Sequence, residues 1–400
     1  MDPILHASAA VLLLLALPGP GDPLRTAVAA AVDAGEAGLI ELRRDLHRHP
    51  ELAGQEERTA GIVAGRLEAA GLEVRTGVGG HGVVAVLHGG RPGPVVAYRA
   101  DMDAMASEVP DPGPFPSETP GVRHICGHDV HTTIAVGIAE AFAAVREDIP
   151  GTVVFLFQPA EETAEGAAAL IEDGALDDPA PEAIFAVHCA PLPVGQIASG
   201  EGILLAGVDL VRVALSGDGD PAGAAEASAR VITAAAGTGE GEGFTEAGVL
   251  GSEASEGGWT VTGMVRASTG ERRAVARESI RAGLSALELD GVTLDLAYEE
   301  HAIPPVDNDP ELIRRSGETL RSVLGDSAVV LVDEPTPSFS EDFSRFQERI
   351  PGALWFLGVS NPERGIMGLP HHPRFAADEK AIGIGAKAMA AVLLDVLESE

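Results

Sequence analysis

The peptides VVAYRADMDA, residues 95–104, and TVVFLFQPAEE, residues 152–162, decide the fold. Each is a short apolar run that ends in carboxylates, Asp101 and Asp103 in the first peptide and Glu161 and Glu162 in the second. Continuous apolar runs of this length predict strands that are buried on both faces, as in a parallel sheet covered by helices. Ligands of such sheets bind at the carboxyl ends of the strands, so these carboxylates are the first candidates for a functional site.

Helical patterns alternate with further short apolar runs on both sides of these peptides. We expect helices at 24–47, 56–70, 132–145 and 164–172, and strands at 83–87, 95–98, 152–157 and 183–187. After Pro304 and Pro305 the pattern returns, with a strand at 353–357 and a last helix at 379–397. This alternation predicts an α/β fold whose mainly parallel sheet is covered by helices.

The order of elements changes between residues 207 and 300. It becomes strand, helix, strand, strand, helix, strand, over 208–215, 223–236, 245–250, 259–266, 272–288 and 292–298. This order predicts a compact, ferredoxin-like α+β insert. We therefore expect a catalytic domain made of residues 24–206 and 301–400, with an inserted lid domain at 207–300.

Composition excludes several classes of protein. The chain has 27 Lys and Arg against 61 Asp and Glu, a formal net charge of −34. A field of this sign repels nucleic acids and anionic membrane surfaces. The two cysteines, Cys126 and Cys189, form at most one disulfide, so a disulfide scaffold is also excluded.

The N-terminal residues 1–23 contain an apolar run at 9–17 that is too short to span a bilayer. One interpretation is a signal peptide, although residues 1–6 carry no Lys or Arg and no A-x-A cleavage site follows. The other is an apolar leader that packs on the body. Cytoplasmic and exported locations therefore both stay open, and we expect no transmembrane segment later in the chain.

Polar clusters recur where the apolar runs end. They contain Asp101 and Asp103, then Cys126, His128, Asp129 and His131, then Glu161 and Glu162, then His188, and finally His371 and His372. Thiolate, imidazole and carboxylate together suit a transition metal, whereas Mg²⁺ or Ca²⁺ would call for oxygen ligands. The sequence thus predicts a metal site.

Spacing within the clusters suggests local conformations. Cys126 and His128 can turn to one side in a loop, whereas a helix would separate their directions by about 200°; we therefore expect the helix to begin near His131. Glu161 and Glu162 would point oppositely in a strand, one toward the metal and the other toward a bound water.

Each cluster alone also has a purely structural explanation. A lone cysteine such as Cys189 is usually a small buried hydrophobe, and a lone histidine such as His81 or His301 is usually a surface residue. Paired glutamates commonly lie on a solvated helix face. Five clusters at predicted strand ends or adjoining loops favour one shared site over five coincidences.

The sequence resembles a known enzyme family in seven stretches, in the family's order. They are RRDLHRHPELAGQEERTA, YRADMDA, CGHDVHTT, FQPAEETAEGAAALIEDGAL, VHCAPLPVGQIA, SEDFSRF and HHPRFAADEKAIGIGA. The family is that of the di-metal amidohydrolases and metallopeptidases related to aminoacylase. The branch most similar comprises hippurate hydrolases, N-acyl-amino-acid hydrolases and auxin-conjugate hydrolases.

The resemblance implies roles for particular residues. Glu161 matches the general base, and Asp103 matches a carboxylate that orients a ligand imidazole. The resemblance implies that His371, and not its neighbour His372, is a metal ligand, because the family's ligand lies two residues before the proline. The full set of implied ligands is Cys126, His128, Glu162, His188 and His371.

The implied reaction is hydrolysis of an amide by a water held between two divalent transition metal ions, Zn²⁺, Mn²⁺, Co²⁺ or Ni²⁺. The implied substrate is an N-acyl amino acid or another amino-acid conjugate. Arg266 is a candidate to bind a substrate carboxylate, with a surface arginine as the alternative. Relatives dimerise through the lid, which implies a homodimer.

The lid departs from the family pattern. Relatives carry a GGHAA segment whose histidine reaches the oxyanion across a dimer, whereas LSGDGDPAG here has Pro221 at that position, together with Asp218 and Asp220. A later asparagine segment is also missing. An oxyanion donor contributes about 10²- to 10³-fold in rate, so a catalytically impaired metal-binding homologue stays open as an alternative to the amidohydrolase. A dipeptidase or carboxypeptidase of the same superfamily is a second alternative.

Overall fold

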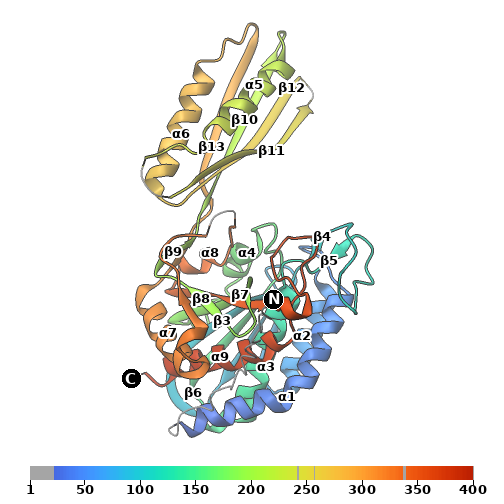
Figure 1. The fold of residues 1–400 in the computed structure, drawn as a ribbon, viewed down its shortest axis with the longest axis vertical. Helices are drawn as coiled ribbons and strands as arrows, with labels where there is room; N and C mark the ends of the chain where they lie inside the picture. Colours follow the sequence, from blue (N-terminus) through green and yellow to red (C-terminus); the bar gives the residue numbers. More distant parts are fainter. Residues whose placement is uncertain (1–21, 241–242, 256, 337–338, 400) are drawn as a thin grey trace, which may run out of the picture.

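The computed structural model describes residues 22–240, 243–255, 257–336 and 339–399. Two bodies of unequal size meet at a narrow connection (Figure 1). The expected leader at 1–23 lies outside the described residues except for its last two positions. Among the helices that the structure describes, none is long and apolar enough to cross a membrane.

The larger body is built on an eight-stranded sheet whose centre is parallel. Its strands, in spatial order, are β1 (Glu73–Val78), β2 (Gly82–His88), β6 (Pro150–Gln158), β3 (Arg91–Asp101), β7 (Ala183–Pro193), β16 (Gly352–Ser360), β8 (Ile197–Ser199) and β15 (Val329–Leu331). β6, β3, β7 and β16 pair in parallel, as do β8 and β15, whereas β1, β2 and β8 add antiparallel pairs. The predicted mainly parallel sheet is confirmed.

The apolar runs form strands because both faces of the sheet are covered. In β6, Val153, Phe155 and Phe157 belong to the core on one face, and Val154 and Leu156 to the core on the other. The first face is covered by α1 (Pro23–Arg48), α2 (Glu57–Ala69), α3 (His128–Ala144), α7 (Pro310–Leu324) and α9 (Lys380–Leu397). The second is covered by the short helices α4 (Gly166–Glu172) and α8 (Ser344–Gln347). In β6 nearly every side chain therefore leaves water, whichever way it points.

Short strand pairs and 3-10 turns complete the larger body. The pairs are β4 (Met105–Ala106) with β5 (Val122–Arg123), and β9 (Gly202–Leu205) with β14 (Val306–Asn308). The 3-10 turns are Arg146–Asp148, Asp326–Ala328 and Pro362–Arg364.

The smaller body, called the inserted body below, spans residues 208–303. Its elements are β10 (Val208–Gly217), α5 (Pro221–Ala234), β11 (Thr245–Ser255), β12 (Gly258–Ala267), α6 (Gly270–Ser285) and β13 (Val292–Ile303). The strands form an antiparallel sheet in the order β11-β12-β10-β13. Both helices pack on one face of this sheet, where Ile232 and Ile280 share a core with Val211, Val213 and Val261. The predicted α+β insert is confirmed as part of the fold class.

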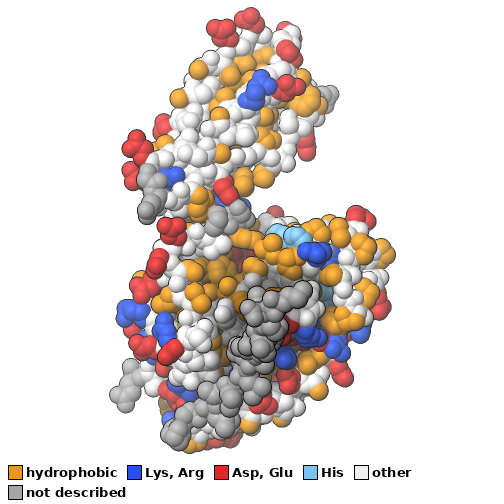
Figure 2. All heavy atoms as spheres, in the orientation of Figure 1, with side chains coloured by type: hydrophobic (Ala, Val, Ile, Leu, Met, Phe, Trp, Pro, Cys, Tyr) orange, Lys and Arg blue, Asp and Glu red, His pale blue; other side chains and the backbone are white. Residues whose placement is uncertain are grey.

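The acidic residues lie mainly on the surface of both bodies. Figure 2 shows Asp and Glu side chains distributed over both bodies on the face that it draws. Hydrophobic and histidine side chains instead gather on the larger body just below the connection. The candidate functional site lies in the same part of the larger body.

Candidate metal centre

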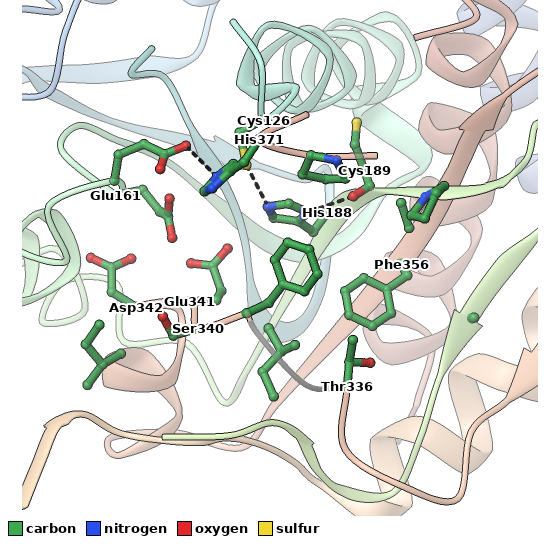
Figure 3. Close-up of a pocket in the computed structure, with 18 of the residues that line it drawn as sticks. Cys126, Glu161, His188, Cys189, Thr336, Ser340, Glu341, Asp342, Phe356 and His371 are labelled. Carbon is green, nitrogen blue, oxygen red and sulfur yellow. Dashed lines mark hydrogen bonds and ion pairs between the residues drawn. The ribbon is translucent and has the colours of Figure 1, made fainter. Parts of the chain in front are cut away.

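A cavity of about 420 Å³ lies at the carboxyl ends of the central strands, between the two bodies. Five of the predicted catalytic and metal-ligating residues line it, together with a substantial apolar wall. The site residues are Cys126, Glu161, Glu162, His188 and His371, and the apolar wall includes Leu192, Leu205, Ile303, Phe339 and Phe356. In Figure 3, Glu161, Glu341 and Asp342 gather on one side of the cavity, and His188 and Phe356 lie across from them.

Cys126 and His128 lie on either side of a helix start. α3 begins at His128 rather than near His131, so the expectation that His128 belongs to a loop is wrong. Gly127 caps the helix with φ +100°, and a Cβ there would lie 2.7 Å from Cys189 Sγ. This left-handed glycine turns the chain sharply. Cys126, His128 and His188 thereby offer ligand atoms within 4.8 Å of one another.

The two glutamates lie on a turn, not in a strand. β6 ends at Gln158, so the expectation that Glu161 and Glu162 point oppositely from a strand is wrong. Both carboxylates approach the same atom instead, since Glu161 Oε2 and Glu162 Oε1 each lie 3.7 Å from His128 Nε2. The expected helix at 164–172 begins only at Gly166, because Ala164 takes φ +57°.

Two further histidines of the predicted ligand set, His188 and His371, border the cavity. His188 lies inside β7, which continues to Pro193, so it does not end the strand as expected. Its Nδ1 lies 2.8 Å from the carbonyl oxygen of Cys189, and its Nε2 lies 3.3 Å from Cys126 Sγ. His371 Nε2 lies 3.4 Å from Glu162 Oε1. His372 does not line the cavity, and its Nδ1 accepts the backbone N–H of Arg374.

Two neighbouring residues have supporting contacts. Asp103 Oδ1 lies 3.1 Å from His128 Nδ1, on the side of the ring away from Glu161 and Glu162. His131 uses both ring nitrogens, with Nδ1 donating to Asp101 and Nε2 accepting the backbone N–H of Cys189, each at 2.7 Å. His131 is therefore engaged in the scaffold, whereas Nε2 of His128 stays directed toward the glutamates.

Sequence reasoning missed a buried ionic network beneath the glutamates. Arg99 contacts Asp101 at 2.6 Å, Glu341 at 2.8 Å and Asp342 at 3.1 Å, and all four side chains are fully buried. Two features of the sequence could have predicted this network: an arginine within an otherwise apolar strand, and two adjacent acidic residues in SEDFSRF. Arginine is almost never fully buried without partners, so its position alone pointed to acids from elsewhere in the chain.

Negative charge is in excess at the site. Six carboxyl groups are buried or nearly buried at the site, and the guanidinium of Arg99 pairs with three of them, Asp101, Glu341 and Asp342; the other three are Asp103, Glu161 and Glu162. Burial together with the neighbouring Glu341 and Glu162 raises the pKa of Glu161 well above its usual range. Burial and the carboxylates of Glu162 and Glu161 likewise raise the pKa of the Cys126 thiol. Buried charges require compensation, which bound cations supply.

The side chains fit divalent metals. Nε2 of His128 and Oε1 of Glu162 are buried and have no hydrogen-bond partner among the described residues, as expected of atoms that coordinate an ion. Two overlapping groups can each hold a metal, Cys126 with His128 and His188, and Cys126 with Glu162 and His371. Thiolate and imidazole among them favour transition metals.

Arg266 reaches the same cavity from the inserted body. It lies on β12, and its side chain is only 12% exposed. Its Nη1 lies 3.5 Å from Glu246 Oε2, and burial lowers the pKa of its guanidinium. Pro221 does not line the cavity, because it starts α5 after Asp220 has capped that helix. β10 separates it from the connection by about 30 Å at the usual rise per residue.

Comparison with known proteins agrees with the family resemblance of the sequence. Residues 97–395 match the model of peptidase family M20/M25/M40. An IAA-amino acid hydrolase ILR1-like 6 from Arabidopsis thaliana is 35% identical over 89% of this chain and 79% of its own length. An N-acetylcysteine deacetylase from Bacillus subtilis is 33% identical over 90% of this chain and 97% of its own length.

A solved structure extends the likeness to the fold. It is the YXEP protein of Bacillus subtilis, described as a dinuclear metal-binding peptidase of the M20 family. Its TM-score with this chain is 0.76 at 30% identity, covering 92% of this chain and 99% of its own. The match and the donor groups of the cavity together support two divalent metal ions.

Proposed function

The chain belongs to peptidase family M20/M25/M40 and is a metal-dependent hydrolase of amide or peptide bonds, and from that premise we propose that it cleaves N-acyl amino acids. One observation carries the proposal: a single cavity combines four of the candidate metal ligands, an apolar wall and Arg266. An N-acyl amino acid has the matching parts, which are a scissile amide, an acyl group and a free carboxylate. Two relatives are named for substrates of this kind.

We assign the metal ligands as Cys126, His128, Glu162, His188 and His371. When bound, two divalent transition metals would supply Lewis acidity toward the amide carbonyl and lower the pKa of a coordinated water. Asp103 holds the imidazole of His128 through Nδ1, which leaves Nε2 for coordination. The choice among Zn²⁺, Mn²⁺, Co²⁺ and Ni²⁺ depends on availability as much as on the ligands.

Glu161 is the general base in this proposal. Its carboxylate accepts a proton from the water that attacks the amide carbon, and then delivers that proton to the amine nitrogen as the C–N bond breaks. Supporting this role, the side chain lines the cavity but is 8% exposed, so bulk water competes little for its oxygens.

Arg266 binds the substrate carboxylate in this proposal, because a guanidinium pairs with a carboxylate through two hydrogen bonds. Its place on β12 makes the inserted body a lid that contributes directly to substrate binding. Pro221 lacks a side-chain hydrogen-bond donor, so any oxyanion donor must come from another residue than in the relatives.

The proposal includes a homodimer formed through the inserted body. β11 is one of the two edge strands of its sheet and exposes Val249 and Leu250, the latter by 61%. An exposed apolar edge strand of this kind can pair with a strand of a second chain. Sedimentation of the purified chain would measure the oligomeric state, and a monomer at micromolar concentration would contradict this part of the proposal.

The test of the reaction uses protein reconstituted with Zn²⁺ or with Mn²⁺ and a panel of N-acetyl, N-benzoyl and indole-acetyl amino acids. We expect hydrolysis by the wild type and a loss of about 10²- to 10⁴-fold in kcat for Glu161→Gln, with two metals retained. Glu165→Gln is the matched control, because this exposed glutamate lies on the same turn. No detectable turnover by the wild type on any member of the panel would reject the proposal.

The assignment of Arg266 has its own experiment. Arg266→Gln should raise KM about 10- to 100-fold for substrates with a free carboxylate, as expected for a hydrogen bond to a charged group. KM for the same substrates with a C-terminal amide should change little. Arg212→Gln, at an exposed position of the same sheet, serves as the control. Equal effects on both substrate series would remove Arg266 from carboxylate binding.

A further inference from the structure

The turn at residues 159–166, called the glutamate turn below, has an unusual backbone. It presents Glu161 and Glu162 to the cavity, and two of its alanines adopt positive φ, Ala160 at +53° and Ala164 at +57°. It also folds back tightly, because a Cβ on Gly166 would lie 1.6 Å from the carbonyl oxygen of Pro159. Non-glycine residues keep such conformations only when their surroundings impose them.

Three carboxylates impose this conformation by accepting backbone N–H groups in or just after the turn. Glu56 Oε1 accepts the N–H of Ala160 at 2.8 Å, and Asp103 Oδ2 accepts that of Glu162 at 2.9 Å. Asp342 Oδ2 accepts the N–H of Ala167, the residue after the turn, at 3.0 Å. None of the three is more than 1% exposed, so water does not compete for these hydrogen bonds.

Each carboxylate belongs to a different part of the fold. Glu56 precedes α2 and also accepts the N–H of Gly54 at 2.9 Å. Asp342 precedes α8 and is held by Gln158 Nε2 at 2.7 Å and Arg99 Nη2 at 3.1 Å. The glutamate turn is therefore tied at its start, its middle and its end to segments that are distant in sequence.

We infer that Glu56 and Asp342 are positioning residues, which fix the glutamate turn at its two ends and so set the places of Glu161 and Glu162. Glu56 does not line the cavity, and it contacts the glutamate turn through the N–H of Ala160. The kinetic part of this inference rests on the proposed function of Glu161, whereas the part concerning metal retention rests on Glu162 as a ligand. Displacements of about 1 Å at a catalytic group cost about 10²-fold in rate.

Glu56→Ala and Glu56→Gln give the central test. The alanine variant loses both hydrogen bonds, whereas the glutamine carbonyl can still accept the N–H groups of Gly54 and Ala160. We expect Glu56→Ala to lower kcat about 10- to 100-fold with KM within about 3-fold, and to weaken Zn²⁺ retention against a colorimetric chelator by about 10- to 100-fold. Glu56→Gln should recover most of both losses.

Glu51→Ala is the matched control. Glu51 also accepts two backbone N–H groups, those of Arg58 at 2.9 Å and Thr59 at 2.8 Å, but these lie at the start of α2 and not in the glutamate turn. We expect a lower Tm for this variant, with kcat and Zn²⁺ retention unchanged. If Glu56→Ala behaves like Glu51→Ala, losing Tm alone, Glu56 is a purely structural residue and the inference is wrong.

Asp342→Asn tests the other end and keeps the inference falsifiable if Glu56→Ala does not fold. Asp342 accepts from donors on both oxygens, and an amide can accept on one side only. Reduced Zn²⁺ retention and reduced kcat are expected, and unchanged values of both would overturn the role of Asp342. If the wild type hydrolyses no amide, the proposed function fails, while the comparison of Zn²⁺ retention still decides this inference.

Discussion

Two buried polar clusters meet at the segment 126–129, and they differ in charge balance. The cavity cluster, which contains Cys126, His128, Glu161 and Glu162, has more carboxylates than cations. The rear cluster pairs Arg43 and His47 with Asp129, each at 2.8 Å, and pairs Arg123 with Asp111 at 2.5 Å. Its two arginines therefore balance its two aspartates.

This difference distinguishes a candidate metal ligand, His128, from a structural residue, Asp129, at adjacent positions. Asp129 finds its cations within the chain, so it needs no ligand to remain buried. His128, one residue earlier, directs Nε2 toward two carboxylates and has no hydrogen-bond partner there among the described residues. A buried polar cluster that the chain leaves uncompensated is the place to look for a metal.

The largest expected effect comes from the cavity cluster. Cys126→Ala should weaken binding of one Zn²⁺ by about 3 to 4 kcal/mol, roughly 10²- to 10³-fold, since about 10 to 16 kcal/mol is shared among four ligands of a zinc site. Titration of the apoprotein with Zn²⁺ measures this change. The stability of the metal-free protein should change far less. Undiminished binding of two ions by Cys126→Ala would remove this residue from the ligand set.

An intermediate effect is expected in the rear cluster. Arg43→Ala leaves the buried carboxylate of Asp129 without its arginine, which should lower the free energy of unfolding by about 3 kcal/mol. Urea denaturation measures the loss, and Arg44→Ala is a useful control because Arg44 is 40% exposed. Zn²⁺ stoichiometry should remain that of the wild type. If Arg43→Ala lost bound Zn²⁺ but kept the stability of the wild type, the rear cluster would belong to the metal site and the comparison of the two clusters would fail.

The smallest effect concerns acid stability in the rear cluster. Burial alone would raise the pKa of Asp111, but hydrogen bonds from His47, the Ser117 N–H and Arg123 outweigh it and lower the pKa to about 2. Because the folded pKa lies below the unfolded value of 3.8, the stabilisation is complete above about pH 4 and is lost as the pH falls toward 2. The stability difference between wild type and Asp111→Asn should be about 1 kcal/mol smaller at pH 3 than at pH 5. An equal difference at both pH values, measured by urea denaturation, would contradict the lowered pKa.

Much of the fold could be predicted because its strands are buried on both faces and therefore appear as continuous apolar runs. β3, β6 and β16 were recognisable in this way. β8 and β15 were not, since each has three residues and is held by pairing with strands distant in sequence. Membership of peptidase family M20/M25/M40 confirms the resemblance that the motifs carry.

The candidate site could be predicted as a set of residue types, but not as a geometry. The spacing of Cys126 and His128 suggested a loop, whereas the left-handed Gly127 lets a helix begin at His128. The pair Glu161 and Glu162 suggested a strand, whereas the chain turns after Gln158. In both cases local spacing admits several backbone paths, and contacts with distant segments select one.

The sequence by itself determined the fold class, the inserted α+β body and the chemical nature of the site, because apolar periodicity and ligand chemistry are properties of local residues. Tertiary structure alone decided the buried partners of Arg99 and the hydrogen bonds that Glu56 and Asp342 accept from backbone N–H groups in or just after the glutamate turn. These interactions join residues far apart in the chain, and no local pattern encodes which distant carboxylate will accept a given N–H. Only packing of the complete sheet and its helices brings them within hydrogen-bond distance.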